Sequence, residues 1–422
     1  MAENSSEFKP YIPADKITPE FTITSILTGI ILAIVFGAAN AYLGLRVGMT
    51  ISASIPAAVI AMGITRIIFK KNSILESNMV QTIGSAGESV AAGAIFTMPA
   101  LFLWAKEGLI NQPSLLSISL ITLCGAILGV LFMIPLRNSI IVQEHGILPY
   151  PEAQACAEVL LAGEKKGSDA KAVFSGMAIA TLLISTILLK VSGDTGAHGM
   201  VSAITIGSII CVIAAIAGDT SQDLKTGYIL GATPKKQQIG ELVGAIISAL
   251  TIGGVLILLD SAWGFGSKEL AAPQATLMKL VTEGVMNGNL PWSYVFIGAA
   301  CTVLFELLGL PSLAVAIGIY LPIELTAPIM LGGVLRRLMD KKNKTQSSES
   351  SKGVLFCSGL IAGEGLMGVL LAILTVAGIA DKIGLGANIP AGVRLAGSVI
   401  LLVVLVTLIV CHNRSAKNEK AE

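Results

Sequence analysis

The chain reads Asn78-Met-Val-Gln-Thr-Ile-Gly-Ser-Ala-Gly-Glu-Ser-Val-Ala-Ala-Gly93 at the start of an apolar run that continues to about Trp104. At about 100° per residue, a helix would place four polar side chains of this segment within one narrow arc: Asn78, Gln81, Ser85 and Glu88. Lipid cannot hydrogen-bond to such groups, so the arc must face protein or water. The segment therefore predicts a membrane helix whose polar face lines a solute pathway.

The composition places the whole chain in the membrane. Its 422 residues are 54% hydrophobic and 13% charged, whereas soluble proteins carry about 25% charged residues. The 45 glycines and the 5% of aromatic residues are typical of transmembrane helices that touch through small residues. The net charge of +1 argues against a nucleic-acid partner. These values predict an all-α polytopic membrane protein.

Apolar runs of about 20 residues mark the helices that could span a bilayer. They predict about eleven spans (10–13), at 22–45, 47–69, 79–104, 114–136, 172–191, 199–217, 239–259, 291–309, 313–335, 354–380 and 394–411. Two shorter stretches, 150–162 and 273–288, predict interfacial or re-entrant helices. A single transmembrane domain would then cover 22–411, with a cytoplasmic tail at 1–21, a basic, Ser-rich loop at 336–353 and a C-terminal tail at 412–422.

The orientation of the spans follows from the basic residues of the loops. Lys and Arg of the early loops would be cytoplasmic if the N-terminus is inside. The first twenty residues lack the pattern of a cleaved signal peptide, so the first span would direct the chain to the membrane. The basic loop at 336–353 would fall outside, which indicates that one crossing between Lys236 and Pro291 is unaccounted for.

Four carboxylates lie within predicted spans: Glu88, Glu306, Glu324 and Glu364. A charge at the bilayer centre costs at least about 2.5–3.5 kcal/mol, and intramembrane ionisable groups are functional by default. A carboxyl group that burial pushes toward the protonated form can load and release a proton. We expect Glu88, Glu324 and Glu364 to couple protons or to contact a cationic part of the solute. The alternative is a neutral Glu that hydrogen-bonds between helices.

Two other polar blocks could reach a cavity. One begins Tyr150-Pro-Glu-Ala-Gln, with the Pro and Glu of a good helix start; the other is Gly218–Tyr228, which could form a local network around a turn. The candidate side chains are Tyr150, Glu152 and Gln154 in the first block, and Gln222, Asp223 and Lys225 in the second. A solvated cytoplasmic helix and an ordinary loop are the alternatives.

Several motifs of other protein classes are absent from the sequence. It has no GxxxxGK[ST] phosphate loop, no HExxH and no GxSxG, and its six cysteines form no CxxC pair. We therefore expect no enzymatic activity, no cofactor and no protein-bound metal site.

A possible internal sequence repeat indicates a duplicated core. Leu43-Gly-Leu45, Pro56, Arg66 and Ala86-Gly-Glu88 recur in the same order as Leu308-Gly-Leu310, Pro322, Arg336-Arg337 and Ala362-Gly-Glu364. Transporter repeats commonly frame a site near the membrane midplane. The repeat predicts that the Glu88 and Glu364 helices face one cavity, although short Gly/Leu strings also match by chance.

Five blocks resemble the oligopeptide transporter (OPT) family, near its prokaryotic members and the yellow-stripe-like metal-chelate transporters. They are 78–93, 150–160, 217–234, 309–337 and 359–368. The resemblance implies secondary active uptake by proton symport in the plasma (inner) membrane. It implies small oligopeptides or peptide-like metal chelates as solutes, and a homodimer by family habit.

The sequence departs from that family in two ways. The signatures of the fungal peptide branch are absent, and the spacing of the matching blocks predicts that a group of helices is missing at roughly 175–200. The chain is therefore interpreted as an internally shortened member. The alternatives to a coupled transporter are a passive channel and a shortened member that does not transport.

Overall fold

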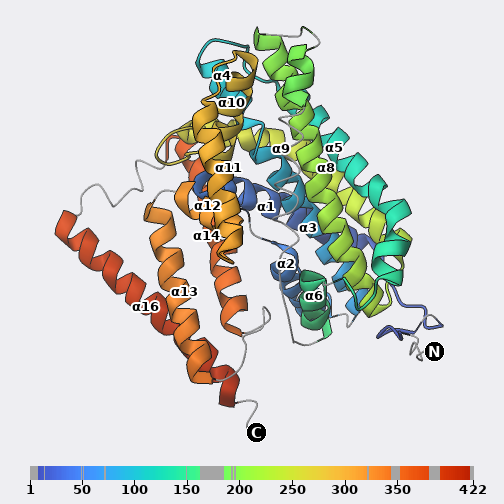
Figure 1. The fold of residues 1–422 in the computed structure, drawn as a ribbon. Helices are drawn as coiled ribbons and strands as arrows, with labels where there is room; N and C mark the ends of the chain where they lie inside the picture. Colours follow the sequence, from blue (N-terminus) through green and yellow to red (C-terminus); the bar gives the residue numbers. More distant parts are fainter. Residues whose placement is uncertain are drawn as a thin grey trace.

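The computed structural model describes residues 8–13, 15–48, 50, 52–70, 73–148, 150–161, 185–191, 193, 196–320, 323–343, 352–379 and 390–418. Within these ranges every regular element is helical (Figure 1). The main elements are α1 (Ile23–Val47), α2 (Ser54–Gly63), η1 (Ile64–Ile68), α3 (Ile74–Ile95), α4 (Pro99–Lys106), α5 (Leu115–Arg137), η2 (Asn138–Gln143), α6 (Pro151–Leu161), α8 (Gly196–Leu230), α9 (Pro234–Trp263), α10 (Pro273–Met286), α11 (Trp292–Leu307), α12 (Ser312–Tyr320), α13 (Ile323–Asn343), α14 (Lys352–Val376) and α16 (Ala391–Asn418).

Five of the described helical segments are long and apolar enough to cross a membrane: Ile23–Val47, Ile74–Lys106, Leu115–Gln143, Gly196–Leu230 and Pro234–Trp263. These segments, and the absence of strands from the described residues, confirm the all-α class but not the count of eleven spans. The span predicted at 47–69 is replaced by the short pair α2 and η1. The span predicted at 172–191 and the shortening near 175–200 fall largely on residues outside the described ranges.

Helix α3 lies at the centre of the bundle. The most apolar window of Ile74–Lys106 is 89% buried, against 39% for Leu115–Gln143. α1 runs parallel to α3, because Gly29 meets Ile83 and Gly44 meets Ile95 further along both helices. A Cβ added at Gly37 would lie 2.9 Å from the carbonyl oxygen of Gly87. Small residues thus bring the two backbones together, as in many membrane helix pairs.

A long hairpin, α8 and α9, packs on another side of α3. Residues 218–228, expected to contain a turn or form a loop, instead continue α8 as a helix to Leu230. Positive φ at Gly231, which is 90°, ends the helix and begins the return to α9. A side chain at Gly227 would overlap the amide of Gln237, so this glycine lets the two helices approach closely.

The N-terminal segment lies across the turn of this hairpin. The N–H groups of Tyr11 and Ile12 donate to the carbonyls of Ile229 and Leu230, each at 3.0 Å. Further along, the Glu20 carboxylate accepts the N–H of Thr233 at 2.9 Å. The segment is therefore tied to the hairpin by backbone and side-chain hydrogen bonds.

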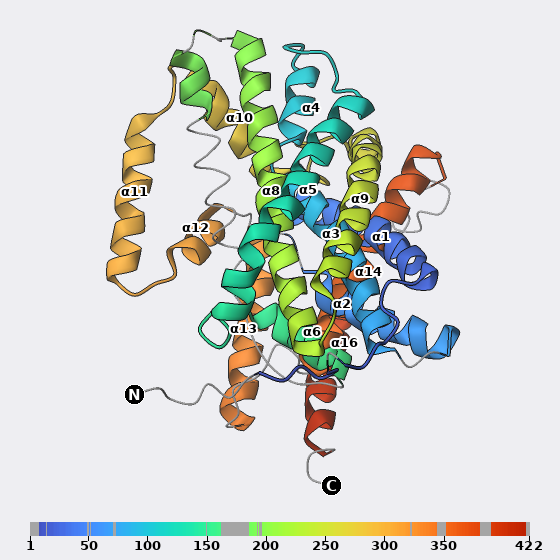
Figure 2. The ribbon, with the colours of Figure 1, turned by 90° about the vertical axis from the view of Figure 1, so that its right-hand side faces the viewer.

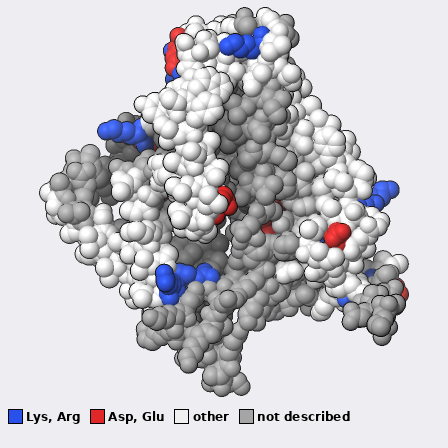
Figure 3. Space-filling model, in the orientation of Figure 1, with Lys and Arg blue, Asp and Glu red and all other residues white. Residues whose placement is uncertain are grey.

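Helices α11, α12, α13 and α16 lie around the outside of the bundle (Figure 1 and Figure 2). α11 has no buried residue, and its exposed side chains include Trp292, Phe296 and Leu307. The span predicted at 313–335 is divided into α12 and α13. Most of the described surface on the face in Figure 3 is uncharged, as expected of helices that meet lipid.

Candidate functional site

Glu88 is held between α1, α2 and α3. Its side chain is buried, and Oε1 accepts the amide of Asn40 on α1 at 3.1 Å. Oε2 accepts the backbone N–H of Ala53, also at 3.1 Å. Since Ala53 is the N-cap of α2, the carboxylate lies at the positive end of that helix. Each oxygen of the buried carboxylate therefore has a hydrogen-bond donor.

The position of α2 follows from its small apolar residues. α2 runs antiparallel to α3, because Ala53 meets Glu88 and Ala57 meets Gly84 one turn further on. The helix begins at buried residues, Ala53 and Ser54, and the described residues between Gly48 and Ser54 are not helical. In many transporters the N-terminus of a half-helix points at an anionic group of the substrate, whereas here the N-terminus of α2 points at the protein's own Glu88. The sequence did not reveal it, because 47–69 has one charged residue, Arg66, and otherwise has the length and hydropathy of a single span.

The polar arc of α3 continues toward α8. Gln81 Nε2 donates to Asp223 Oδ1 at 2.6 Å, and Ser85 Oγ donates to Asp223 Oδ2 at 2.9 Å. Asn78 is fully buried, and neither amide atom of its side chain has a hydrogen-bond partner. Asn78, Gln81, Ser85 and Glu88 are each at most 2% exposed. Their arc therefore packs against protein, and the pathway role stays a prediction.

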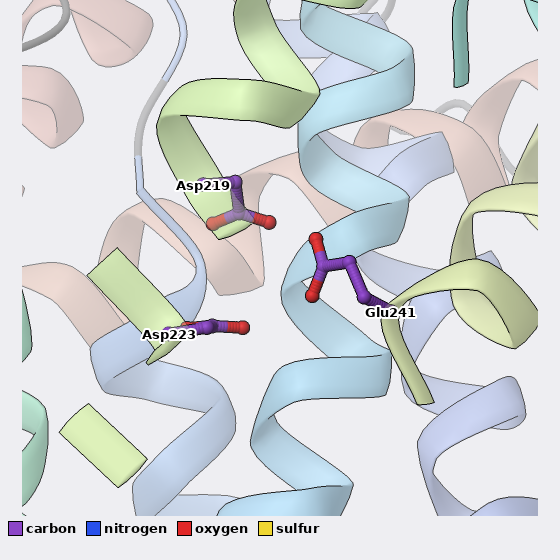
Figure 4. A group of neighbouring side chains, drawn as sticks. All are labelled: Asp219, Asp223 and Glu241. Carbon is purple, nitrogen blue, oxygen red and sulfur yellow. The ribbon is translucent and has the colours of Figure 1, made fainter. Parts of the chain in front are cut away.

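Three carboxylates meet where α8 and α9 face α3: Asp219, Asp223 and Glu241 (Figure 4). One carboxylate oxygen from each lies within 4.8 Å of the others. Asp219 and Asp223 share a face of α8, because residues four apart are neighbours on a helix. Sequence reasoning missed Asp219 and Glu241. The signals were the i, i+4 spacing and a Glu near the start of the apolar run 239–259.

The other residues of the second polar block contact different elements. The Gln222 side chain accepts the N–H of Ala153 on α6 at 3.0 Å. Lys225 is buried and donates to the carbonyl of Ile141 at 2.7 Å. The expected network of Gln222, Asp223 and Lys225 is thus distributed over three neighbouring elements, because successive residues of a helix point in different directions.

Lys225 also lies among aromatic rings near the end of α8. Its Nζ is 5.0 Å from the centroid of Tyr150 and 5.3 Å from that of Tyr228, within reach of a cation–π interaction. Burial raises the pKa of the Tyr150 phenol. Burial and then the charge of Lys225 lower the pKa of His145.

The first polar block forms α6 as expected. Tyr150 is buried before the helix, and its hydroxyl donates to the carbonyl of Ile140 at 3.3 Å. Glu152 accepts a hydrogen bond from Ser52, the residue before the N-cap of α2. Gln154 is exposed. Of these three candidates, Glu152 is therefore the one with a hydrogen bond to the segment before α2 in the described structure.

The remaining candidates lie on the outer helices. The side chain of Glu364 on α14 is 57% exposed, and its Oε1 is 3.7 Å from Nη1 of Arg46. Glu306 is exposed and accepts a hydrogen bond from Ser312. Glu324 lies at the start of α13, but its side chain is outside the described part of the structure. Glu88 and Glu364 thus have different partners on α1.

The family of the chain follows from comparison with known proteins. The profile described as OPT oligopeptide transporter protein matches residues 20–179 and 171–375. The chain belongs to the oligopeptide transporter family. Its apolar helices agree with a multi-pass membrane protein of this family.

Relatives from three organisms are similar to parts of the chain. A Haemophilus influenzae protein named "Putative oligopeptide transporter" is 34% identical over 48% of this chain and 37% of its own length. A Saccharomyces cerevisiae protein named "Putative oligopeptide transporter YGL114W" is 28% identical over 39% of this chain and 25% of its own. The Arabidopsis thaliana protein named "Probable metal-nicotianamine transporter YSL8" is 27% identical over 48% of this chain and 30% of its own. The chain thus covers less than half the length of these relatives.

Proposed function

We propose that this chain is a secondary active transporter that uses protons to import small oligopeptides or peptide-like metal chelates. It would lie in the plasma (inner) membrane, with its N-terminus in the cytoplasm, and assemble as a homodimer. The names of the relatives support both solute classes. The observation that carries the proposal is the buried Glu88 at the N-terminus of α2.

The geometry supports a link between the protonation of Glu88 and the position of α2. The Ala53 N–H and the Asn40 amide both donate to the carboxylate, so each of its oxygens has a donor in the packed arrangement. Movement of α2 away from α3 would remove one donor and the helix end together. The protonated form would then be favoured, which couples proton loading to a structural change.

One assay, with the purified chain in proteoliposomes, tests both the solute class and the proton coupling. Uptake of labelled di- to pentapeptides and of iron and nickel chelates is measured with and without an inward proton gradient. We expect the gradient to stimulate uptake by the unmodified chain. Glu88→Gln should abolish this stimulation while flux down a solute gradient continues, because the amide stays polar but cannot exchange a proton.

Glu306→Gln is the matched control, since Glu306 is an exposed carboxylate on an apolar helix, and it should keep the proton dependence. Unchanged proton dependence in Glu88→Gln would show that Glu88 is not the coupling group. Flux in the unmodified chain that ignores the gradient would instead indicate a passive channel. No uptake of any solute would indicate a shortened, non-transporting member.

A further inference from the structure

We infer that Asp219, Asp223 and Glu241 form a binding site for a hard divalent cation of about the size of calcium. The three carboxylates come from α8 and α9 and converge beside α3 (Figure 4). Binding of such an ion is independent of the proposed transport activity. The argument rests on charge, on an unpartnered oxygen atom and on the kind of ligand.

The cluster brings three buried carboxylates together, and their negative charge must be neutralised by a cation or by protons. Asp219 is 8% exposed, and Asp223 and Glu241 are each 1% exposed. Among the described residues, no Lys or Arg forms an ion pair with Asp223 or Glu241 within 4.0 Å. Nearby Lys225 donates to Ile141 instead. Buried carboxylates this close repel one another unless a bound cation or protons neutralise them.

A neutral side chain from another helix independently indicates a ligand. Gln81 is fully buried, and its Nε2 is fixed on Asp223 at 2.6 Å. Its Oε1, on the same carbon atom, has no hydrogen-bond partner. An orphaned buried oxygen is costly, whereas a cation beside Asp223 would give the Gln81 oxygen a partner.

The ligand type selects the class of ion. All four candidate ligands offer oxygen, which hard cations prefer, whereas softer transition metals favour nitrogen and sulfur. Calcium binds oxygen at 2.3–2.6 Å, so opposed ligands are about 4.6–5.2 Å apart. The carboxylate oxygens lie within 4.8 Å of one another, which suits this radius. Magnesium demands near-ideal octahedral geometry and keeps several of its waters, which a buried cluster of protein oxygens suits less well.

Bound calcium would connect three helices at one point. Asp219 and Asp223 anchor it to α8, Glu241 to α9, and Gln81 to α3. An ion that binds the folded chain raises its unfolding temperature by mass action. The predicted signature is therefore saturable stabilisation by calcium that needs all three helices.

The test uses the full chain, purified in detergent and stripped with a chelator. Calcium, magnesium and sodium chlorides are titrated at constant ionic strength and pH, with thermal unfolding and calorimetry as readouts. We expect one calcium per chain and a rise in the unfolding temperature, with binding at least tenfold weaker for magnesium. Glu241→Gln should weaken calcium binding at least tenfold, and Asp219→Asn serves if that variant does not fold.

Asp260→Asn is the matched control, because Asp260 lies on the same helix α9 but pairs with Lys106 at 3.1 Å. It should bind calcium as the unmodified chain does. Absence of calcium binding by the unmodified chain would overturn the inference, whatever the variants do. Stabilisation by acid or by sodium alone would do the same, as would unchanged affinity in Glu241→Gln.

Discussion

Helices α3 and α14 both carry Ala-Gly-Glu and both pack on α1, yet their glutamates differ completely in environment. Glu88 is 2% exposed, whereas the side chain of Glu364 is 57% exposed. On α3 the glycine of the motif, Gly87, touches the backbone of Ala33; on α14 a Cβ at Gly363 would meet nothing within 4 Å. The motif alone therefore does not determine burial.

The surrounding residues explain the difference. α3 carries Asn78, Gln81 and Ser85 in addition to its glutamate, and other helices cover these groups. α14 is otherwise apolar near its glutamate, and the glycine that touches α1 is Gly365, which lies against Ala39. A helix with several polar groups must be enclosed by protein, whereas a helix with one can leave it at the edge.

The largest loss of stability is expected from a substitution that breaks the contact between α3 and α1. Gly87→Val would force a side chain into the carbonyl oxygen of Ala33, and a backbone atom cannot move away by changing rotamer as a side chain could. We expect a loss of about 3 kcal/mol or more of unfolding free energy, at the upper end of overpacking costs. Thermal unfolding in detergent, followed by tryptophan fluorescence, measures it. Gly363→Val is the control and should change stability by only about 0.5 kcal/mol; equal losses would contradict the comparison.

A smaller effect is expected from the α1 partner of Glu88. Asn40→Leu removes an amide donor from a buried carboxylate, which should cost about 1–3 kcal/mol. The same unfolding measurement applies. Asn78→Leu is the control, because neither amide atom of Asn78 has a hydrogen-bond partner, so its loss should be neutral or stabilising. A greater loss of stability in Asn78→Leu than in Asn40→Leu would contradict this contrast between an amide bonded to Glu88 and an amide without a partner.

The smallest effect is expected from the α1 partner of Glu364. Arg46→Gln removes an ion pair whose side chains are 47% and 57% exposed, so the cost should be at most about 1 kcal/mol. Chemical denaturation with urea at low and at high salt measures it, and salt should erase the difference by screening. A larger cost that persists in 1 M salt would place Glu364 in a buried site like that of Glu88.

The sequence predicted the helical class and several individual elements well. The polar arc of α3 and the short helices α6 and α10 occur in the structure, and Gln81 and Ser85 of that arc contact Asp223. Periodicity reveals which face of a helix is polar, so residues within one segment could be grouped.

Contacts between segments could not be predicted in the same way. Glu241 and Asp219 are brought together by the close approach of α8 and α9, which depends on the packing at Gly227. The start of α2 beside Glu88 depends on a break in the run 47–69, and hydropathy alone does not show where this run is broken. The polar block at 218–228 reads as a loop, but its groups are satisfied by α3 and α6, so it can remain helical.

The N-terminal segment has a practical consequence for protein engineering. Residues Tyr11, Ile12 and Glu20 fasten it to the turn between α8 and α9, only two helical turns from Asp223. A truncation that removes these residues would take their hydrogen bonds from the turn of the hairpin that holds the acidic cluster. Reporter domains and affinity tags are better attached after α16, which lies at the edge of the bundle (Figure 1).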